Sequence, residues 1–233
     1  MSDLIARTSE APLPATVEAA NAASAAKDWP RAAALWDELR AARPHDAHRW
    51  FAAGHAYSEA RMLEQAERIL GEAVTRFPDH RWIACRHAIV ARYAGDCAEA
   101  LNRAEKLRQS APDFWPAWLE SSEILVKLGR QQEAEQLLQE AATRFPDEYW
   151  PNHAAARLQA DRSDPQGALR TWYALAERFP DQPSATAALK TAVAAAERSA
   201  GATAPGNRSS DTNAEGLAVR LFRRSRRPNG RIS

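Results

Sequence analysis

Histidine and cysteine are the residues of this sequence best suited to binding a metal ion or to acting in catalysis. His45, His48 and His55 lie close together, and the seven-residue spacing of the last two would place them on one face of a helix. No third ligand with suitable spacing follows them. Cys85 and Cys97 have neither a second cysteine pair nor an HxxxH motif beside them. We therefore expect no metal site and no cofactor, and we expect both thiols to be free and partly buried.

The sequence motifs of the common enzyme classes are missing. There is no G-x-x-x-x-G-K-[ST], no G-x-S-x-G and no H-E-x-x-H, and the nine glycines are dispersed along the chain. An independent active site is therefore not expected, and the sequence predicts that the protein is not an enzyme.

The composition favours a folded protein of the cytoplasm. The chain has 233 residues, of which 45% are hydrophobic and 26% are charged. The first thirty residues contain no apolar segment behind a basic start, and no stretch approaches the ~18 apolar residues that a membrane span requires. A cytoplasmic location is therefore expected. The excess of arginine over lysine and the abundant alanine indicate a GC-rich bacterial genome.

The elements that would position functional residues repeat at a constant interval. The run RFPD occurs at 76–79, 144–147 and 178–181. Five prolines share one regular spacing: Pro44, Pro78, Pro112, Pro146 and Pro180. An alanine column has the same spacing: Ala32, Ala66, Ala100, Ala134 and Ala168. This period predicts an array of similar structural units.

Each repeat contains the apolar spacing of a helix. Leu63, Ala66 and Leu70 form a stripe at i, i+3 and i+7, and a second helix precedes this one across a short breaker such as Gly95 or Gly129. The proline then ends the helix pair, because it lacks an N–H group and has a fixed φ angle. Three aspartates follow these prolines and are candidates for capping the next helix: Asp79, Asp147 and Asp181.

These residues resemble the tetratricopeptide repeat (TPR), a helix-turn-helix unit of about 34 residues. The segment WFAAGHAY, from Trp50 to Tyr57, resembles the opening W-x₂-L-G-x₂-Y, with Ala53 in place of leucine. The pattern continues at Ala66, Leu70, Ala73 and Pro78. The resemblance implies an all-α, right-handed superhelical solenoid of five repeats and a capping helix. The expected boundaries are a flexible N-terminus at 1–12, repeats at 13–46, 47–80, 81–114, 115–148 and 149–182, a cap at 183–198, and a flexible linker with a basic tail at 199–233.

TPR proteins usually serve in recognition, so the resemblance implies a concave groove that holds a peptide or partner protein. The first helices of the repeats would line it with the residues opposite the Trp50, Ala53 and Tyr57 stripe. These residues are His48, Phe51, His55, Trp82, Arg86, Ile89, Tyr93, Glu120, Glu123, Lys127, Trp150, His153 and Arg157.

Aromatic and arginine side chains are enriched at binding hot spots. The expected centre of the groove is Trp82, Arg86, Tyr93, Trp150 and Arg157. In an alternative interpretation, the two tryptophans follow the RFPD turns and only pack on the preceding helix pair.

Some TPR proteins hold the acidic C-terminus of a chaperone with a clamp of lysine and asparagine. Val17, Ala52 and Trp82 fall where clamp residues would be expected. A chaperone co-factor is therefore disfavoured.

The C-terminal tail is basic. Residues 201–233 hold seven arginines and two acids, a net charge of +5, which leaves the first 200 residues at −4. Five of the arginines lie near an apolar segment: Arg220, Arg223, Arg224, Arg226 and Arg227. The tail could make a weak contact with an anionic membrane or with nucleic acid, or bind as a linear motif. It could equally be a solvated chain end.

The sequence thus predicts a non-catalytic scaffold for protein–protein interaction. The alternative is a recognition or regulatory subunit of an enzyme complex, such as envelope-polysaccharide transfer or secretion machinery. The sequence leaves the partner, the pathway and the oligomeric state open.

Overall fold

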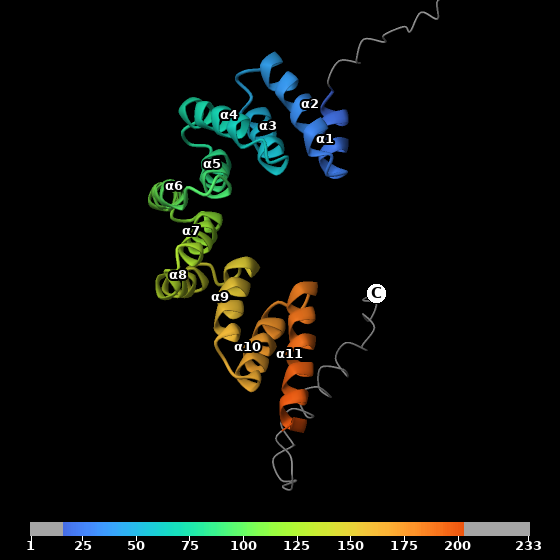
Figure 1. Cartoon of the computed structure of the whole chain (residues 1–233), viewed down its shortest axis with the longest axis vertical. Coiled ribbons are helices and arrows are strands. Elements are labelled where there is room, and N and C mark those ends of the chain that lie inside the picture. The colour runs from blue at the N-terminus through green and yellow to red at the C-terminus, as the bar shows by residue number, and fades with distance from the viewer. Residues whose placement is uncertain (1–15, 203–233) are drawn as a thin grey trace, which may run out of the picture. The chain divides into compact units, whose positions relative to one another are not determined.

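The computed structural model describes residues 16–202, and within this range the chain is entirely α-helical, without a strand (Figure 1). The predicted all-α fold is confirmed, whereas the hand of a superhelix stays a prediction. The helices are α1 (Val17–Ala25), α2 (Trp29–Ala42), α3 (Ala47–Glu59), α4 (Leu63–Arg76), α5 (Arg81–Tyr93), α6 (Cys97–Ser110), α7 (Trp115–Lys127), α8 (Gln131–Arg144), α9 (Tyr149–Asp161), α10 (Pro165–Arg178) and α11 (Pro183–Ala202). In this part of the chain no helix combines the length and apolar character needed to cross a bilayer.

The period of the proline and alanine columns is also the period of the helices. α3, α5, α7 and α9 begin at equal intervals along the chain, and so do α4, α6, α8 and α10. Each predicted repeat therefore contains a first and a second helix, and α11 follows the last pair. The predicted N-terminal segment 1–12 and the tail arginines 220–227 lie outside the described residues.

The chain forms two compact bodies that divide between Ala134 and Glu135, inside α8. The first body contains the described residues 16–134, and the second contains residues 135–202. Consecutive helices pack on each other from α1 to α7 in the first body and from α9 to α11 in the second, and in the first body α3 also contacts α5, and α5 contacts α7. The first helices thus lie side by side in the first body.

Small residues allow the helices of a pair to approach closely. Four alanines of the alanine column are fully buried: Ala32, Ala66, Ala100 and Ala134. α3 and α4 also approach closely at Gly54, which contacts Leu70. A Cβ atom on Gly54 would lie 2.4 Å from Leu70 Cδ2, so a larger residue does not fit without movement.

The recurring proline turn is closed by a side chain from the helix that follows it. The Trp50 indole N–H donates a hydrogen bond to the Pro44 carbonyl at 2.9 Å. The same bond recurs from Trp118 to the Pro112 carbonyl at 3.3 Å, two repeats later. In the fifth repeat Asn152 replaces tryptophan at this position, and its amide N–H₂ donates to the carbonyl of residue 146 at 3.2 Å. Each bond satisfies a carbonyl at a helix end that has no partner within the helix.

The predicted role of the aspartates after the prolines is wrong for two of the helices. The N-cap of α5 is His80, whose imidazole nitrogen accepts from the Ile83 N–H at 3.3 Å. The N-cap of α9 is Glu148, which makes no side-chain capping bond. Asp79 and Asp147 precede these cap positions by one residue. Their carboxylates therefore do not cap the helices.

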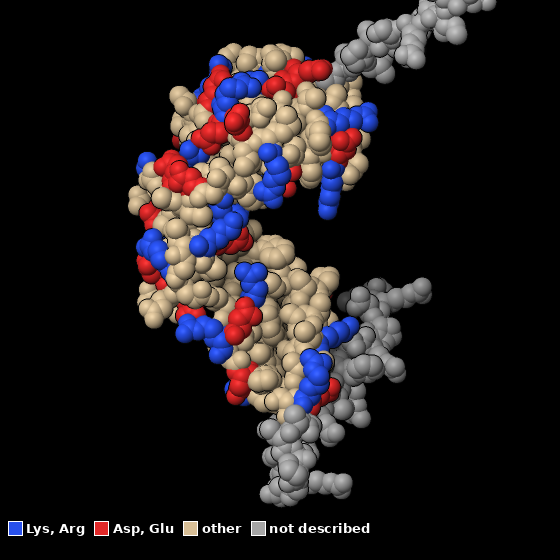
Figure 2. Space-filling view, viewed as in Figure 1, with Lys and Arg blue, Asp and Glu red and all other residues tan. Residues whose placement is uncertain are grey.

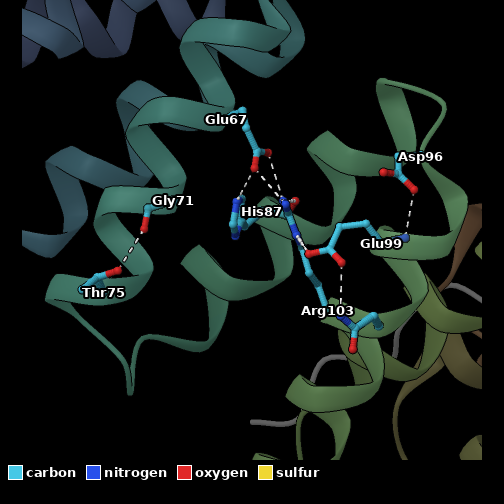
Figure 3. A network of polar contacts seen from close by, with 8 residues as sticks. Glu67, Gly71, Thr75, His87, Asp96, Glu99 and Arg103 are labelled. Atoms are coloured by element: carbon cyan, nitrogen blue, oxygen red, sulfur yellow. Dashed lines mark hydrogen bonds and ion pairs between the residues drawn. The ribbon is translucent and has the colours of Figure 1, made fainter.

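A polar network joins the repeats 47–80 and 81–114 (Figure 3). Both terminal nitrogens of Arg103 on α6 donate to the Glu67 carboxylate on α4, at 2.9 and 2.8 Å. The His87 ring on α5 lies 3.0 Å from the same carboxylate, and Glu99 accepts from Arg103 Nε at 2.8 Å. Burial raises the pKa of Glu67, but its contacts with Arg103 and His87 outweigh burial and leave the pKa below its usual value.

Candidate protein-binding surface

The predicted partner-binding residues of α3 are joined by ring contacts. Phe51 stacks on His55, with 5.9 Å between ring centroids, and on His80, with 6.3 Å. His48 is exposed, and its ring meets the edge of Trp36 at 5.7 Å. The side chains of Phe51 and His55 are half-buried. This end of the surface is therefore aromatic and well ordered by packing.

Arg86 on α5 pairs with Glu59 on α3. The guanidinium donates to the Glu59 carboxylate at 3.0 Å, and the His55 ring lies 3.9 Å from the same oxygen. Burial, and then the positive charge of Arg86, lower the pKa of His55 from 6.5 to about 4, although Glu59 opposes this change. His55 is therefore uncharged at neutral pH. The ion pair links the first helices of neighbouring repeats.

Trp82 is the second residue of α5 and is 51% exposed. Its ring meets Phe114 at 5.0 Å in an edge-on contact, so packing holds the ring while about half of its surface stays open to solvent. Ile89, two helical turns along α5, is half-buried against the cluster that contains Phe114. The contact of Trp82 is thus with Phe114, which follows α6, and not with the preceding helix pair of the alternative interpretation, while about half of the side chain stays open to solvent.

Tyr93 lies at the end of α5 beneath a guanidinium group. The Arg61 side chain is 4.0 Å from the centre of the Tyr93 ring, and Arg92 is 5.2 Å from it. These are cation–π distances. One face of the Tyr93 ring is therefore covered by a cation of the chain itself.

Glu120 on α7 belongs to an internal ion pair. Arg92 donates to its two carboxylate oxygens at 2.5 and 3.1 Å and lies 3.3 Å from Glu123. Burial raises the pKa of Glu120, and Arg92 opposes this change. Glu120 is buried, whereas Glu123 and Lys127 are exposed. A ligand can therefore reach Glu123 and Lys127, although binding at Glu123 would compete with its contact to Arg92.

The second body carries a cluster of aromatic rings on α9 and α10. Trp150 is 50% exposed, and its ring lies 5.1 Å from Tyr149 and 5.8 Å from His153. His153 also lies 5.4 Å from Trp172 on α10. Arg157, one turn beyond His153, is exposed. The structure thus brings together the three residues predicted on α9.

Sequence reasoning missed several members of these surfaces. Glu59 and Arg61 contact the predicted residues Arg86 and Tyr93, and Trp172 extends the aromatic cluster from the second helix of its repeat. The repeat period could have predicted the contacts of Glu59 and Arg61, because the stacking of equivalent helices places the end of one first helix next to the first helix of the following repeat. The pattern of a single helix does not include such contacts between neighbouring repeats.

The histidines and cysteines of the described residues form no metal site. No group of three potential metal ligands occurs in residues 16–202. Cys85 is a buried free thiol, and burial raises its pKa to about 12. A thiol with so high a pKa is a poor nucleophile at neutral pH.

Positive and negative side chains are mixed on the face of the molecule that Figure 2 shows. Figure 2 shows lysine and arginine interspersed with aspartate and glutamate over the visible face of the described residues. Several charged side chains of the described residues form ion pairs, as Arg86 and Arg92 do. A polyanion such as nucleic acid would therefore meet no extended basic patch on this face.

Comparison with known proteins agrees with the fold. Residues 85–149 match the model of the tetratricopeptide repeat family. A thermophilic TPR protein from Thermus thermophilus has a TM-score of 0.60 at 17% identity, over 75% of this chain and 95% of that chain. MamA of Desulfovibrio magneticus RS-1 has a TM-score of 0.53 at 15% identity, over 70% and 93%. Yeast Tom70 reaches 0.62 at 14% identity over 87% of this chain, which spans 42% of Tom70.

No curated protein matches the sequence. The predicted resemblance to the tetratricopeptide repeat is confirmed by the matched segment and by the fold. A fold of this class supports a scaffold for protein–protein interaction.

Proposed function

We propose that this chain, which has the fold of a TPR array, is a non-catalytic scaffold that binds a peptide or a partner protein on the surface of its first helices. The observation that carries the proposal is the exposure of Trp82 and Trp150. They occupy equivalent positions two repeats apart, and each leaves about half of its surface open to solvent. Large apolar side chains exposed in this way, with polar groups around them, favour a binding role.

The packing of both tryptophans supports this role. Each indole is held at an edge by a neighbouring ring, Phe114 for Trp82 and Tyr149 for Trp150. A ring whose orientation is already fixed loses little conformational entropy when a ligand covers its free face. Tryptophan is also among the residues most enriched at energetic hot spots. The two side chains therefore have the properties of preorganised anchors.

Affinity purification of the tagged protein from its own cell, followed by mass spectrometry, tests the proposal. We expect the double variant Trp82→Ala, Trp150→Ala to lose the retained partner while its thermal unfolding changes little. Met62→Ala is the matched control, because Met62 is an exposed apolar side chain in the turn between α3 and α4. Retention of the partner by the folded double variant would refute the proposal. A stoichiometric enzyme in the eluate would favour the alternative of a regulatory subunit.

The basic tail adds a second, weaker contact to this proposal. Its five clustered arginines lie outside the described residues, and their charge suits an anionic membrane or nucleic acid. We expect low-salt retention on anionic liposomes or nucleic acid to disappear after truncation at Gly201. Retention that is insensitive to both salt and truncation would show that the tail is not the contact.

A further inference from the structure

We propose that the surface of α9 formed by Trp150, His153 and Arg157 binds an acidic peptide segment, with an apolar side chain of the peptide on Trp150 and a carboxylate at Arg157. This inference rests on the proposed function and adds the chemistry of the ligand. The preference for an acidic peptide is thus placed on the second body, which contains α9.

The three residues lie on one stripe of α9. Their spacing of i, i+3 and i+7 places the side chains on the same helical face. Tyr149 is buried beside this stripe, and its hydroxyl forms a hydrogen bond of 2.7 Å with Ser184 on α11. The Trp172 ring on α10 also contacts the His153 ring, with 5.4 Å between ring centroids. Neighbouring helices thus fix the aromatic part of the surface, and only Trp150 and Arg157 extend into solvent.

Arg157 differs from the arginines on α5 in its partners. Arg86 and Arg92 each form an ion pair with a glutamate of a neighbouring first helix. In the described part of the chain no carboxylate lies within ion-pair distance of Arg157. Asp161, one turn later, is exposed and does not pair with it. An incoming carboxylate therefore does not have to displace an internal one.

Arg157 is the positive charge of this stripe at neutral pH. Burial lowers the pKa of His153, and the charge of Arg157 lowers it further, so the imidazole is uncharged. The stripe therefore combines an apolar ring, a neutral imidazole and one unpaired guanidinium. A guanidinium recognises a carboxylate through two parallel hydrogen bonds. A peptide with an acidic residue near an apolar one can place its apolar side chain on Trp150 and its carboxylate at Arg157.

The same charge argues against the protein's own basic tail as the occupant. Its arginines would stack favourably on Trp150, but they would bring like charge to Arg157. The surface also differs from the lysine and asparagine clamp for a C-terminal carboxylate, because an aromatic platform occupies α9. An internal acidic segment is therefore the occupant that we infer.

Peptide display on the full-length chain tests this inference. A random library of twelve-residue peptides is selected on the immobilised protein, and enriched peptides are synthesised with a fluorescent label for anisotropy titrations. We expect enriched sequences to combine aspartate or glutamate with aromatic or aliphatic residues. We expect Arg157→Glu to weaken their binding by about tenfold or more. Arg170→Glu is the matched control, because Arg170 is an exposed arginine of the same body on the second helix α10.

The outcomes separate the inference from the function on which it rests. Enrichment of basic peptides, or equal binding by Arg157→Glu and Arg170→Glu, would overturn the acid preference and leave the scaffold function standing. The absence of any enriched peptide, together with no partner in the purification, would overturn both. Circular dichroism of each variant confirms that a loss of binding does not come from unfolding.

Discussion

Individual side chains near α3 and α5 show how burial decides between a binding role and a structural role. The sequence predicts Arg86 at the centre of a groove, but its side chain is only 17% exposed and it pairs with Glu59. Removing it would leave Glu59 without its partner, so the variant would test stability as well as binding. Trp82 and Trp150, with half of their surface exposed, are better probes of recognition.

His55 makes the stability of the first body depend on pH. Its pKa is about 4 in the folded chain and 6.5 in the unfolded chain, so the unfolded chain binds more protons between these values. The contribution of the uncharged His55 to the free energy of unfolding is therefore fully present above pH 6.5 and is lost as the pH falls toward 4. We expect His55→Gln to reduce the loss between pH 7 and pH 5 by about 1 kcal/mol, after allowance for the partial exposure of the ring. Urea titrations at both pH values measure this difference.

His45→Gln is the control for this titration, because His45 is an exposed histidine outside the helices. Its unfolding free energy should follow the wild type at both pH values. An equal pH dependence in wild type and His55→Gln would show that the His55 ring does not control this loss.

Trp50 should contribute to stability in a way that an exposed tryptophan does not. Trp50→Phe removes the hydrogen bond to the Pro44 carbonyl and reduces the contacts with Arg40 and Arg76, whose guanidinium groups lie 4.4 and 5.1 Å from the ring centre. We expect a cost of about 1 to 2 kcal/mol in the free energy of unfolding. Trp82→Phe, at a half-exposed site, should cost less than about 0.5 kcal/mol. Similar costs for the two variants would contradict the assigned role of the indole N–H.

At the scale of helices, we expect replacement of glycine by alanine to change the stability in opposite directions at Gly54 on α3 and at Gly71 on α4. Gly54→Ala would place a Cβ 2.4 Å from the fully buried Leu70, and we expect it to destabilise by about 1 to 3 kcal/mol. Around Gly71 the nearest atom to a new Cβ is His87 Nε2 at 3.7 Å, an ordinary contact. Gly71→Ala should therefore stabilise by about 0.5 to 1 kcal/mol through helix propensity. Thermal or urea unfolding that shows the same sign for both would refute the close approach of α3 and α4.

The fold was predictable from the sequence because the spacing of apolar residues within a short segment indicates a helix. Apolar stripes, breakers and regularly spaced prolines each act within one helix or one turn. The ion pair of Arg86 with Glu59 was not predicted, because it joins two repeats and depends on how neighbouring first helices align. The capping of α5 by His80 was missed because the sequence pointed to the aspartate one residue earlier. The period of the sequence thus predicts the helices. The contacts between helices decide which candidate side chains remain available to a ligand.

At the scale of the whole molecule, each body has a core of its own. Trp50, Ile69 and Leu70 belong to a buried cluster in the first body, and Leu169 and Leu189 belong to one in the second. In a repeat array, stability is approximately the sum of the repeats and of the interfaces between neighbours. Loss of terminal repeats should therefore shorten the folded array without abolishing it.

Removal of the fifth repeat and the cap tests this additivity. A chain that ends at residue 148 keeps complete helix pairs, so we expect strong helical circular dichroism and a cooperative urea transition with a smaller m-value, because less surface is exposed on unfolding. A chain that ends at residue 130 is the matched control. It retains α7 without α8, and the termination leaves Trp118 and Ile124 on a first helix that lacks the second helix of its repeat. We expect this control to unfold at a lower urea concentration than the longer fragment. If the chain ending at 148 shows no cooperative transition, the first body depends on the second, and the two cannot be treated as independent parts of one repeat array.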